Sequence, residues 1–487
     1  MEHEFIYAIV SRNGKEGIID VHGKEIVPAI YESVGTFKEG MVAVERREND
    51  ESKSKWGFYG RDGMLKVPFM YDLARPFAEG LAPVQLEGKW GYVNLEGELQ
   101  IACKYNLASL FFGGKAIVKL GDRNGIIDTS GNWTVDLPSF DTAEILTENM
   151  LAISHNKKWG VITLKGEMII EPMYDSLRWI EGVGCMVKNV QGEDLMGEAI
   201  YQVGIITLDG QEVIPMRYRS IGSPFYEGVA PFEVSDPADP EYLNTKFGLL
   251  HISGKVVCPP VYDSATPLID GISIVSIKKK GATHPHNPYR YDEVFGAINK
   301  NGDVVIPLIY SSLRPIFFEN TLLIASMGPL KSGGYMHLNR ETLAIKNHAD
   351  WPRYGMIDLR GSVIVPFDYG HIEPLENEYL LVRLAEYQKY GVISLSNQVI
   401  IPFQNAKIES LGKGLFFEKL AEDVCRVFDI QQNLLLELAG VYVTSYDHQM
   451  GLLAVLDKRS GKSGYLDLEG NYIVEPQWDR PFEFELM

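Results

Sequence analysis

The sequence predicts an all-β protein, a tandem array of about twelve antiparallel units, each with three strands and about 34 residues. Three observations support this fold class. A glycine that opens a short apolar run recurs along the chain, a second glycine follows six residues later, and the runs are short and rich in β-branched residues. Repeats of this length are typical of propellers and solenoids, so we expect a propeller-like ring or a β-solenoid or superhelical array.

The first repeated glycine is the anchor of each unit, and copies recur about every 34 residues where no insertion intervenes. The spacing rises to 59 residues at the longest insertion. A degenerate unit, which has Cys425 at the anchor position, completes the set of twelve. The other anchors are Gly17, Gly57, Gly91, Gly125, Gly160, Gly204, Gly248, Gly296, Gly355, Gly391 and Gly464.

Each unit contains three strand signals in a fixed order. The first is an apolar run such as residues 81–84, the second follows the anchor, as in residues 160–162, and the third precedes a proline, as in residues 303–306. The second run is apolar at consecutive positions, so both of its faces must be covered. Stacking each three-stranded sheet face to face on the next is the simplest arrangement that covers them.

The turn between the second and third strands has its own signature. A short polar residue three positions after the anchor, such as Asp20 or Asn94, can accept a hydrogen bond from a backbone N–H two residues on. The glycine six positions after the anchor then supplies the positive φ that closes the hairpin. We interpret this DxxG motif as turn chemistry, because a cation-binding loop would need more carboxylates. The glycines are Gly23, Gly63, Gly97, Gly131, Gly166, Gly210, Gly254, Gly302, Gly361 and Gly470.

Two further positions stay in register with the anchor. A proline eleven residues on fits the end of an outer strand, where its missing N–H costs no ladder bond. An aromatic residue fourteen residues on is expected to pack between neighbouring sheets, although exposed aromatics at this spacing could instead stack on sugars. The aromatic positions are Tyr31, Tyr71, Tyr105, Tyr174, Tyr218, Tyr262, Tyr310, Tyr369 and Trp478.

The consensus resembles that of the WG repeats, also called KWG repeats, which are found in many bacterial proteins. The best matches are Lys55-Trp56-Gly57, Lys89-Trp90-Gly91 and Lys158-Trp159-Gly160. The sequence departs from the pattern where the tryptophan is replaced by Glu16, Asn124, Val203 or Ser463. The resemblance covers nearly the whole chain. It implies little about function, because the family is known mainly as a repeat.

The repeat number leaves three arrangements of residues 1–487 open. Sheets pack about 10 Å apart, so twelve of them in one ring would surround a central opening on the order of 24 Å. Ordinary propellers have only about 4–8 blades. The single array can therefore close as one ring, remain an open superhelix, or split into two sub-arrays.

Four insertions share one topological position, between the first and second predicted strands of four successive units. They are residues 188–203, 235–247, 278–295 and 327–354. In a repeat array, insertions at one position project from one face, often the binding face. Because loops tolerate added length at small entropic cost, neutral drift is the alternative explanation.

The third and fourth insertions contain histidines and aromatic residues that we name as candidate binding residues. A metal site is conceivable there, but histidine as an ordinary polar loop residue is the simpler interpretation. We therefore expect no metal and no cofactor. The candidates are His284, His286, Tyr289, Tyr291, Tyr335, His337, His348 and Trp351.

The composition narrows the class of partner. The chain has 65 acidic and 46 basic residues and a net charge of −19, which argues against binding to nucleic acids or anionic lipid surfaces. No apolar run approaches the ~20 residues that span a bilayer, so we expect no membrane insertion. The first residues lack a secretory signal, and the four cysteines have no CxxC spacing, which predicts buried thiols and a cytoplasmic protein.

Known catalytic signatures are missing from the sequence, which has no GxSxG, HExxH or dinucleotide-binding motif. We therefore predict a non-catalytic scaffold, not an enzyme, that binds a protein partner through a loop-rich face. A carbohydrate- or small-ligand-binding repeat array is the alternative. An enzyme with a site on the inserted loops is the third hypothesis.

Overall fold

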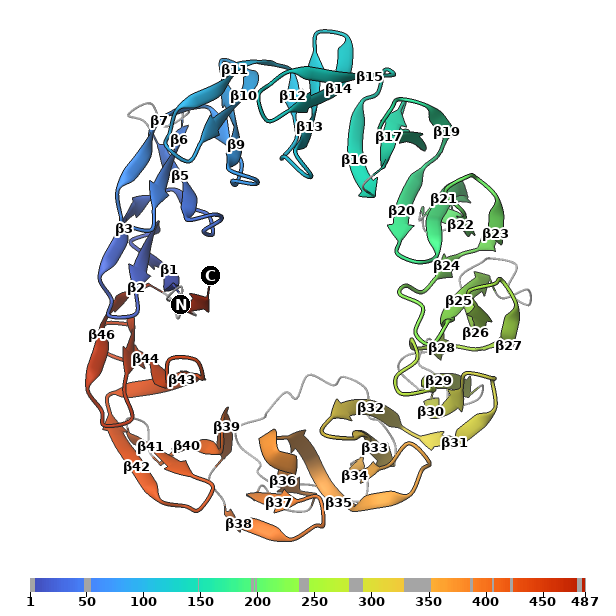
Figure 1. The fold of residues 1–487 in the computed structure, drawn as a ribbon. Helices are drawn as coiled ribbons and strands as arrows, with labels where there is room; N and C mark the ends of the chain where they lie inside the picture. The colour runs from blue at the N-terminus through green and yellow to red at the C-terminus, as the bar shows by residue number, and fades with distance from the viewer. Residues whose placement is uncertain are drawn as a thin grey trace.

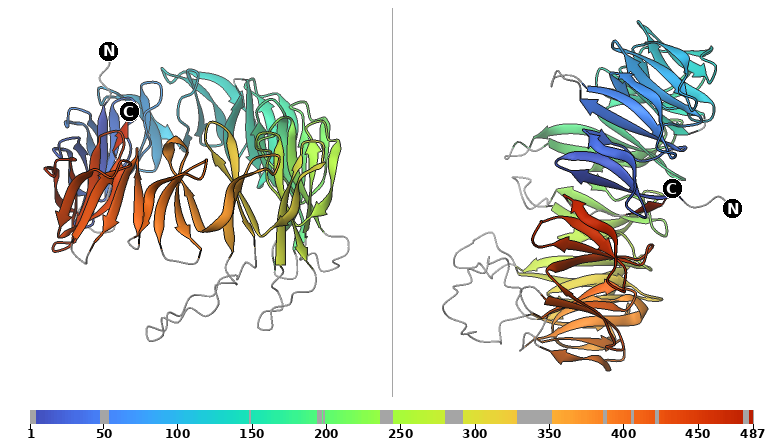
Figure 2. Two further views of the ribbon diagram at one scale, coloured as in Figure 1. Left: turned by 90° about the horizontal axis from the view of Figure 1, so that it is seen from below. Right: turned by 90° about the vertical axis from the view of Figure 1, so that its left-hand side faces the viewer.

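The computed structural model describes residues 5–47, 54–147, 149–193, 197, 199–235, 245–279, 292–327, 352–385, 389–404, 407–420, 424–479 and 484–486. In these ranges the chain forms consecutive antiparallel sheets arranged as the blades of one ring (Figure 1). The strands run roughly along the axis of the ring (Figure 2). The all-β repeat architecture predicted from the sequence is confirmed.

The described strands make twelve blades, and each blade contains four strands where the sequence predicted three. The three predicted strands are present, and a short fourth strand lies nearest the centre of the ring. Blade 1 combines β1–β3 with β47, blades 2–8 are β4–β7 through β28–β31, and blades 11 and 12 are β39–β42 and β43–β46. Blades 9 and 10 form one seven-stranded sheet, because β35 is long enough to serve both.

Six of the twelve innermost strands have only two residues. The twelve innermost strands are β47 (Glu485–Leu486), β4 (Ser33–Val34), β8 (Leu73–Ala74), β12 (Leu107–Ala108), β16 (Thr142–Thr147), β20 (Ser176–Ile180), β24 (Ser220–Ile221), β28 (Ser264–Ala265), β32 (Ser312–Phe317), the end of β35 (Val363–Pro374), β39 (Ile408–Gly412) and β43 (Val441–Asp447). A 3-10 turn, η2 (Glu376–Glu378), follows β35.

The second strands of the blades are the apolar runs that the sequence predicted as the first strands of the units, such as residues 81–84. They are β1 (Ile6–Arg12), β5 (Met41–Arg47), β9 (Leu81–Leu86), β13 (Lys115–Leu120), β17 (Met150–His155), β21 (Gly184–Glu193), β25 (Val229–Ser235), β29 (Ile272–Lys279), β33 (Thr321–Met327), β36 (Tyr379–Leu384), β40 (Leu415–Lys419) and β44 (Leu452–Asp457).

The third strands contain the anchor position. They are β2 (Lys15–Asp20), β6 (Ser54–Gly60), β10 (Lys89–Asn94), β14 (Arg123–Asp128), β18 (Lys158–Thr163), β22 (Ala199–Ile206), β26 (Thr245–His251), β30 (Asp292–Asn299), β34 (Arg353–Ile357), β37 (Tyr390–Ser394), β41 (Val424–Asp429) and β45 (Ser463–Leu466).

The outer strands complete the blades. Besides β35, they are β3 (Glu25–Tyr31), β7 (Leu65–Tyr71), β11 (Leu99–Tyr105), β15 (Trp133–Leu137), β19 (Met168–Tyr174), β23 (Glu212–Tyr218), β27 (Val256–Tyr262), β31 (Val304–Tyr310), β38 (Val399–Gln404), β42 (Leu434–Ala439) and β46 (Tyr472–Trp478).

A bulge in the outer strand explains the anchor glycine. Opposite β6 the register steps from Trp56↔Tyr71 directly to Phe58↔Val67, so residues 68–70 face Gly57 alone. A Cβ built on Gly57 would lie 2.6 Å from the Val67 carbonyl oxygen, which leaves no room for a side chain. The expectation that the proline ends the outer strand is therefore wrong. Pro68 lies within β7, in the bulge. A bulged residue makes no ladder hydrogen bond, so the missing N–H of the proline is tolerated there.

The DxxG turns have the predicted geometry. The ten glycines six residues after the anchor have φ between +74° and +89°. In the first turn, Oδ1 of Asp20 accepts hydrogen bonds from the backbone N–H groups of His22 and Lys24, each at 2.9 Å. The same arrangement recurs at Asp128 and Asp467. The backbone hydrogen bond from Asn132 is the largest cause that lowers the pKa of Asp128, and the side-chain hydrogen bond from Asn471 is the largest cause that lowers the pKa of Asp467.

The hydrophobic core lies between blades. Each pair of neighbouring blades encloses its own cluster of buried side chains, and the twelve clusters run around the ring without interruption. Most of the repeated aromatic residues are buried in these clusters, for example Tyr105 at 1% and Trp478 at 0% exposure. The predicted packing of these rings between sheets is therefore confirmed.

The ring closes where the two ends of the chain meet. Strand β47 pairs antiparallel with β1 and supplies the innermost strand of blade 1. The Tyr7 hydroxyl donates a hydrogen bond to Oε2 of Glu485 at 2.8 Å. Ala8 and Val10 of blade 1 pack with Leu452 and Trp478 of blade 12. Of the arrangements left open by the sequence, the described chain adopts the single closed ring.

Candidate binding surface

The ring has two faces that differ in the turns they contain. One face, here the turn face, contains the DxxG turns and the turns between the innermost and second strands, as shown by the hydrogen bond from Arg61 N to Gly40 O at 3.1 Å. The other, here the insertion face, contains the hairpins between the second and third strands. Strands β21, β25, β29 and β33 all end on the insertion face, the lower one in the left view of Figure 2.

A repeated ion pair lies on the insertion face. The lysine two residues before the anchor pairs with the aspartate that follows the repeated tyrosine, as in Lys158 Nζ to Asp175 Oδ1 at 2.6 Å. The other oxygen of Asp175 accepts a hydrogen bond from Val190 N of the next blade at 2.9 Å. Asp263 makes the equivalent contacts with Lys246 and with Lys278 N, at 2.6 and 2.7 Å. Each aspartate thus joins two blades and fixes the base of a hairpin.

These contacts change the acidity of the aspartates. The hydrogen bond from Lys55 is the largest cause that lowers the pKa of Asp72, and Lys158 and Lys462 do the same for Asp175 and Asp479. The backbone N–H donors of the following blade lower these pKa values further. The charged form of each carboxylate is therefore the form that the fold favours.

The four insertions extend the hairpins of blades 6 to 9. Strands β21 and β22 stay paired up to Glu193↔Ala199, and Lys188 Nζ lies 3.3 Å from the centre of the Tyr201 ring. The other three hairpins are described up to their last paired residues, for example Lys279↔Asp292 in blade 8. The insertions therefore begin side by side, on one face of four successive blades.

The candidate residues of the third and fourth insertions lie outside the described residues. They fall within residues 280–291 and 328–351, so their geometry stays a prediction. In the described ranges, no group of three or more His, Cys, Asp or Glu side chains is placed to hold a metal ion. All four cysteines are free, three of them are buried, and burial raises the pKa of the Cys185 thiol to about 11. No helix long and apolar enough to cross a membrane occurs in the described chain.

A relay of carboxylates joins the first blades on the turn face. Both oxygens of Glu39 accept hydrogen bonds from the N–H groups of Glu79 and Gly80 at 2.8 Å. Glu79 does the same to Gly113 and Gly114 of blade 4, at 2.6 and 2.8 Å. Successive N–H groups of a tight turn form a pocket for an anion, and here a side chain of the preceding blade fills it. The relay ends at Gly113, which has no carboxylate to reach blade 5.

Two adjoining pockets open where this relay ends, between blades 4 and 5. They have volumes of about 560 and 940 Å³ and share Phe112, Ile117, Ile145 and Thr147 as walls. We call them together the 4–5 pocket. The larger part extends to Trp179 and Glu181 of blade 6. This site was not predicted from the sequence, although its signal is Gly113, which stands where blades 2 and 3 have Glu39 and Glu79.

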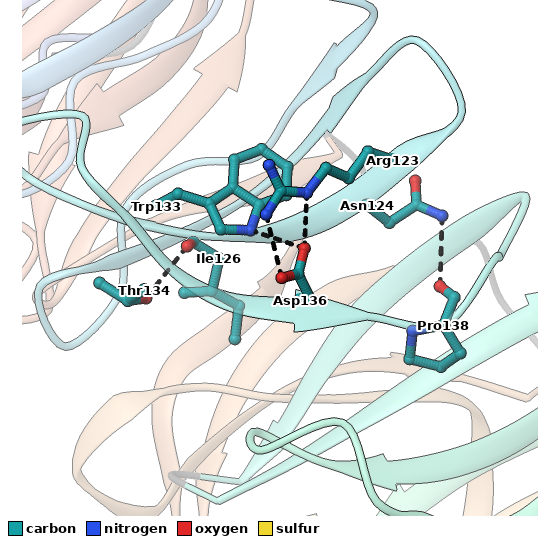
Figure 3. Close-up of polar contacts among 7 residues, drawn as sticks. All are labelled: Arg123, Asn124, Ile126, Trp133, Thr134, Asp136 and Pro138. Atoms are coloured by element: carbon teal, nitrogen blue, oxygen red, sulfur yellow. Dashed lines mark hydrogen bonds and ion pairs between the residues drawn. The ribbon is translucent and has the colours of Figure 1, made fainter.

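The outer part of blade 4 also departs from the repeat (Figure 3). Arg123 occupies the lysine position and pairs through two hydrogen bonds, at 2.6 and 3.0 Å, with Asp136, which replaces the proline. Trp133 Nε1 donates to the same carboxylate at 3.1 Å, and the guanidinium carbon lies 4.5 Å from the Trp133 ring. The hydrogen bonds from Arg123 are the largest cause that lowers the pKa of Asp136.

The anchor tryptophan of blade 4 is replaced by Asn124, which is 1% exposed and donates from Nδ2 to the Pro138 carbonyl oxygen at 3.2 Å. Its Oδ1 has no partner among the described atoms. A Cβ built on Gly125 would lie 2.2 Å from the Trp133 ring, so this ring covers the anchor glycine. These contacts keep β14 and β15 together without the usual tryptophan.

Comparison with protein families gives one match. A family model described as a WG-containing repeat matches nine segments, which together include more than half of the chain. They are residues 17–49, 56–90, 90–123, 125–159, 159–189, 204–236, 247–280, 295–325 and 354–386. No curated protein matches the sequence.

Solved structures share only a distant likeness with the chain. A crystal structure of a eukaryotic initiation factor is 8% identical, with 90% of this chain and 96% of that chain covered and a TM-score of 0.33. Apo AztD from Citrobacter koseri is 11% identical, with 99% and 98% covered and a TM-score of 0.24. With such low TM-scores, neither likeness supports a function.

Proposed function

The chain belongs to the family of WG-containing repeat proteins, and from this premise we propose that it is a non-catalytic scaffold that binds a partner protein through its insertion face. The observation that carries the proposal is that all four insertions begin on one face of the successive blades 6 to 9. Adjacent loops on a rigid support form one continuous surface, as recognition requires.

The support under the insertions is well fixed. Asp175 and Asp263 hold the hairpin bases of blades 6 and 8 through ion pairs and backbone hydrogen bonds. A loop whose base is fixed loses less conformational entropy when it binds a partner. With a net charge of −19, the chain is better suited to a protein partner than to a nucleic acid. Free cysteines support a cytoplasmic location as part of the same proposal.

A sugar-binding array finds less support. Such an array would expose aromatic rings at equivalent positions of several blades. Most of the repeated Tyr and Trp side chains are instead buried between blades, where they cannot stack on a ligand.

Shortening the insertions tests the proposal. In blade 3 the equivalent hairpin is closed by two residues, Glu87 and Gly88, which have φ of +50° and +73°. The same pair can replace residues 280–291 and 328–352, because the flanking residues are already paired in β29–β30 and β33–β34. We expect the melting temperature to stay nearly unchanged, and proteins captured by the parent chain in a pull-down to be lost.

The control is Glu96→Ser in a DxxG turn on the opposite face, which should capture the same proteins as the parent chain. If the shortened protein keeps every partner, the insertion face is not the binding surface. If it unfolds, the insertions belong to the core and the assignment of this face is wrong.

A further inference from the structure

The 4–5 pocket lies along the free edge of a strand. Strand β16 is the innermost strand of blade 5 and pairs on one side only, with β17. Five consecutive residues, 143–147, line the larger part of the pocket. Because successive side chains of a strand point to opposite faces, five in a row indicate that the pocket follows the edge of the backbone. In an antiparallel edge strand, every second residue directs its N–H and C=O towards that open edge.

Blades 4 and 5 lack the contact that joins blades 2, 3 and 4. The carboxylates of Glu39 and Glu79 accept hydrogen bonds from the turn of the next blade, whereas Gly113 has no carboxylate that could bind blade 5. Blade 5 has a six-residue strand, β16, where blades 2 to 4 have two-residue strands followed by compact turns. Figure 1 shows β16 facing the ring centre, beside blade 4.

The wall opposite β16 is apolar and rigid. Leu110 and Phe112 are 39% and 59% exposed, so both present apolar surface to solvent next to the core between blades 3 and 4. Their loop is held by backbone hydrogen bonds between Phe112 and Lys115 and by the Glu79 carboxylate. The Ile117 N–H also donates a hydrogen bond to Ser109 Oγ at 2.9 Å. The apolar surface is therefore presented in a fixed shape before any ligand arrives.

The charge of the larger part of the pocket is negative. Its lining includes Glu144 and Glu181, both exposed, and no lysine or arginine. Neither carboxylate forms an ion pair with any other described residue. An apolar wall beside unpaired carboxylates is complementary to a segment with alternating apolar and basic side chains.

We propose that β16 binds an extended peptide with alternating apolar and basic residues, which adds a fifth strand to blade 5. The peptide backbone pairs with the free edge of β16. Its apolar side chains contact Phe112 and Ile145, and its basic side chains approach Glu144 and Glu181. Strand addition of this kind takes affinity from main-chain hydrogen bonds and specificity from side-chain pockets. The site lies near the ring centre in blades 4 to 6, separate from the insertions of the proposed function.

A synthetic peptide tests this site directly. The probe is a fluorescein-labelled peptide of about eight residues with alternating Lys and Val or Phe, measured by fluorescence anisotropy with the full-length protein. We expect saturable binding that weakens as salt increases. A peptide with Glu in place of Lys should not bind. A peptide with alternate backbone nitrogens methylated, which retains its side chains, should lose about tenfold or more in affinity.

Two variants locate the binding in the 4–5 pocket. Phe112→Ser, and Glu144→Lys combined with Glu181→Lys, should each weaken the probe about tenfold or more. All three side chains are exposed, so the melting temperature should stay near that of the parent. The matched controls are Phe317→Ser, which replaces a 70% exposed ring on another innermost strand, and Glu171→Lys on the outer strand β19. Both should bind the probe like the parent.

Several results would overturn the proposal. Equal binding of the methylated probe would mean that the pocket takes side chains only and that no strand is added. If the pocket variants bind the probe as tightly as the parent, the probe binds outside the 4–5 pocket. If the parent protein at millimolar concentration does not bind the probe, β16 is not a peptide-binding strand. The protein with shortened insertions should still bind the probe, so this test fails or succeeds independently of the proposed function.

Discussion

At the scale of single residues, the repeat uses glycine at two positions for two different physical reasons. The anchor glycine is required by close approach, since the outer strand bulges over it and a Cβ on Gly91 would lie 2.4 Å from the Ile101 carbonyl oxygen. The second glycine is required by its conformation, with φ near +80°. At some units it also contacts the preceding blade. A Cβ on Gly97 would lie 2.5 Å from Lys66 O, whereas on Gly210 the nearest atom is 3.8 Å away.

This difference allows conformational strain to be measured apart from crowding. Gly210→Ala places a side chain in the left-handed region without a clash and should cost about 1–2 kcal/mol of unfolding free energy. Gly97→Ala adds the clash with Lys66 O and should cost about 1–3 kcal/mol more. Urea denaturation of both variants measures the two values. Equal losses would show that the contact between blades is not tight.

Substitutions in the repeat also compensate one another across strands. The anchor tryptophan stands opposite the repeated tyrosine, as in Trp56↔Tyr71 and Trp90↔Tyr105. In blade 12 the small residue is on the third strand and the tryptophan is on the outer strand, with Ser463 opposite Trp478. The larger ring on the outer strand replaces volume lost on the third strand. Blade 12 therefore keeps a closed core without the anchor tryptophan.

At the scale of elements, the aspartate of each lysine–aspartate pair links the outer strand of one blade to the hairpin of the next through a backbone hydrogen bond. Because the pKa of Asp72 and Asp175 is lower in the folded chain than in the unfolded one, the unfolded chain binds protons more readily as the pH falls. The stabilisation by these groups is complete above the unfolded pKa of about 4 and is lost as the pH falls through the folded pKa.

This linkage predicts the behaviour of Asp72→Asn combined with Asp175→Asn. At neutral pH the double variant should melt below the parent, because both ion pairs and their charged hydrogen-bond acceptors are lost. The difference in melting temperature should be constant from about pH 6 to 8 and shrink below about pH 4. The control Glu96→Gln should follow the parent at every pH. A difference that persists at low pH would mean that the aspartates act through packing and not through charge.

The strands and turns were predictable because they depend on local chemistry that recurs in every unit. The positive φ of the DxxG glycines and the burial of the repeated aromatics follow from short stretches of sequence. Six of the innermost strands escaped prediction because pairs such as Ser33–Val34 are too short to show alternation. The position of the proline was misjudged because a bulge is set by the partner strand. The 4–5 pocket needs blades 4, 5 and 6 together, which no single unit reveals.

At the scale of the whole molecule, closure of the ring depends on one contact between distant parts of the sequence. Eleven blade interfaces join neighbours along the chain, whereas the twelfth joins blades 12 and 1 through the core of Ala8, Trp478 and Phe484. Strand β47, which follows blade 12, also pairs with β1 inside blade 1. The repeat pattern of the sequence would be the same in an open array. Closure is therefore a property that only the three-dimensional arrangement reveals.

Removal of β47 tests the importance of this contact. A chain that ends at Asp479 should stay folded, because the eleven other interfaces are intact. It should lose amide-exchange protection mainly in β1–β3 and β43–β46, with an increased radius of gyration in small-angle scattering. Glu485→Gln keeps β47 and is the control, which should preserve protection in β43–β46. A uniform loss of protection over all blades would instead show that the ring unfolds as one cooperative unit.

The placement of β47 also has a consequence for synthesis on the ribosome. Blades 2 to 12 are each built from strands that leave the exit tunnel consecutively, so each can fold against the blade before it. Blade 1 is made before the other eleven blades, yet β1–β3 must wait for β47, which follows blade 12, before their sheet is complete. Throughout elongation, the nascent chain therefore presents the unpaired edge of β1 beside the exposed side of the growing array. The first sheet to be made is the last to be finished.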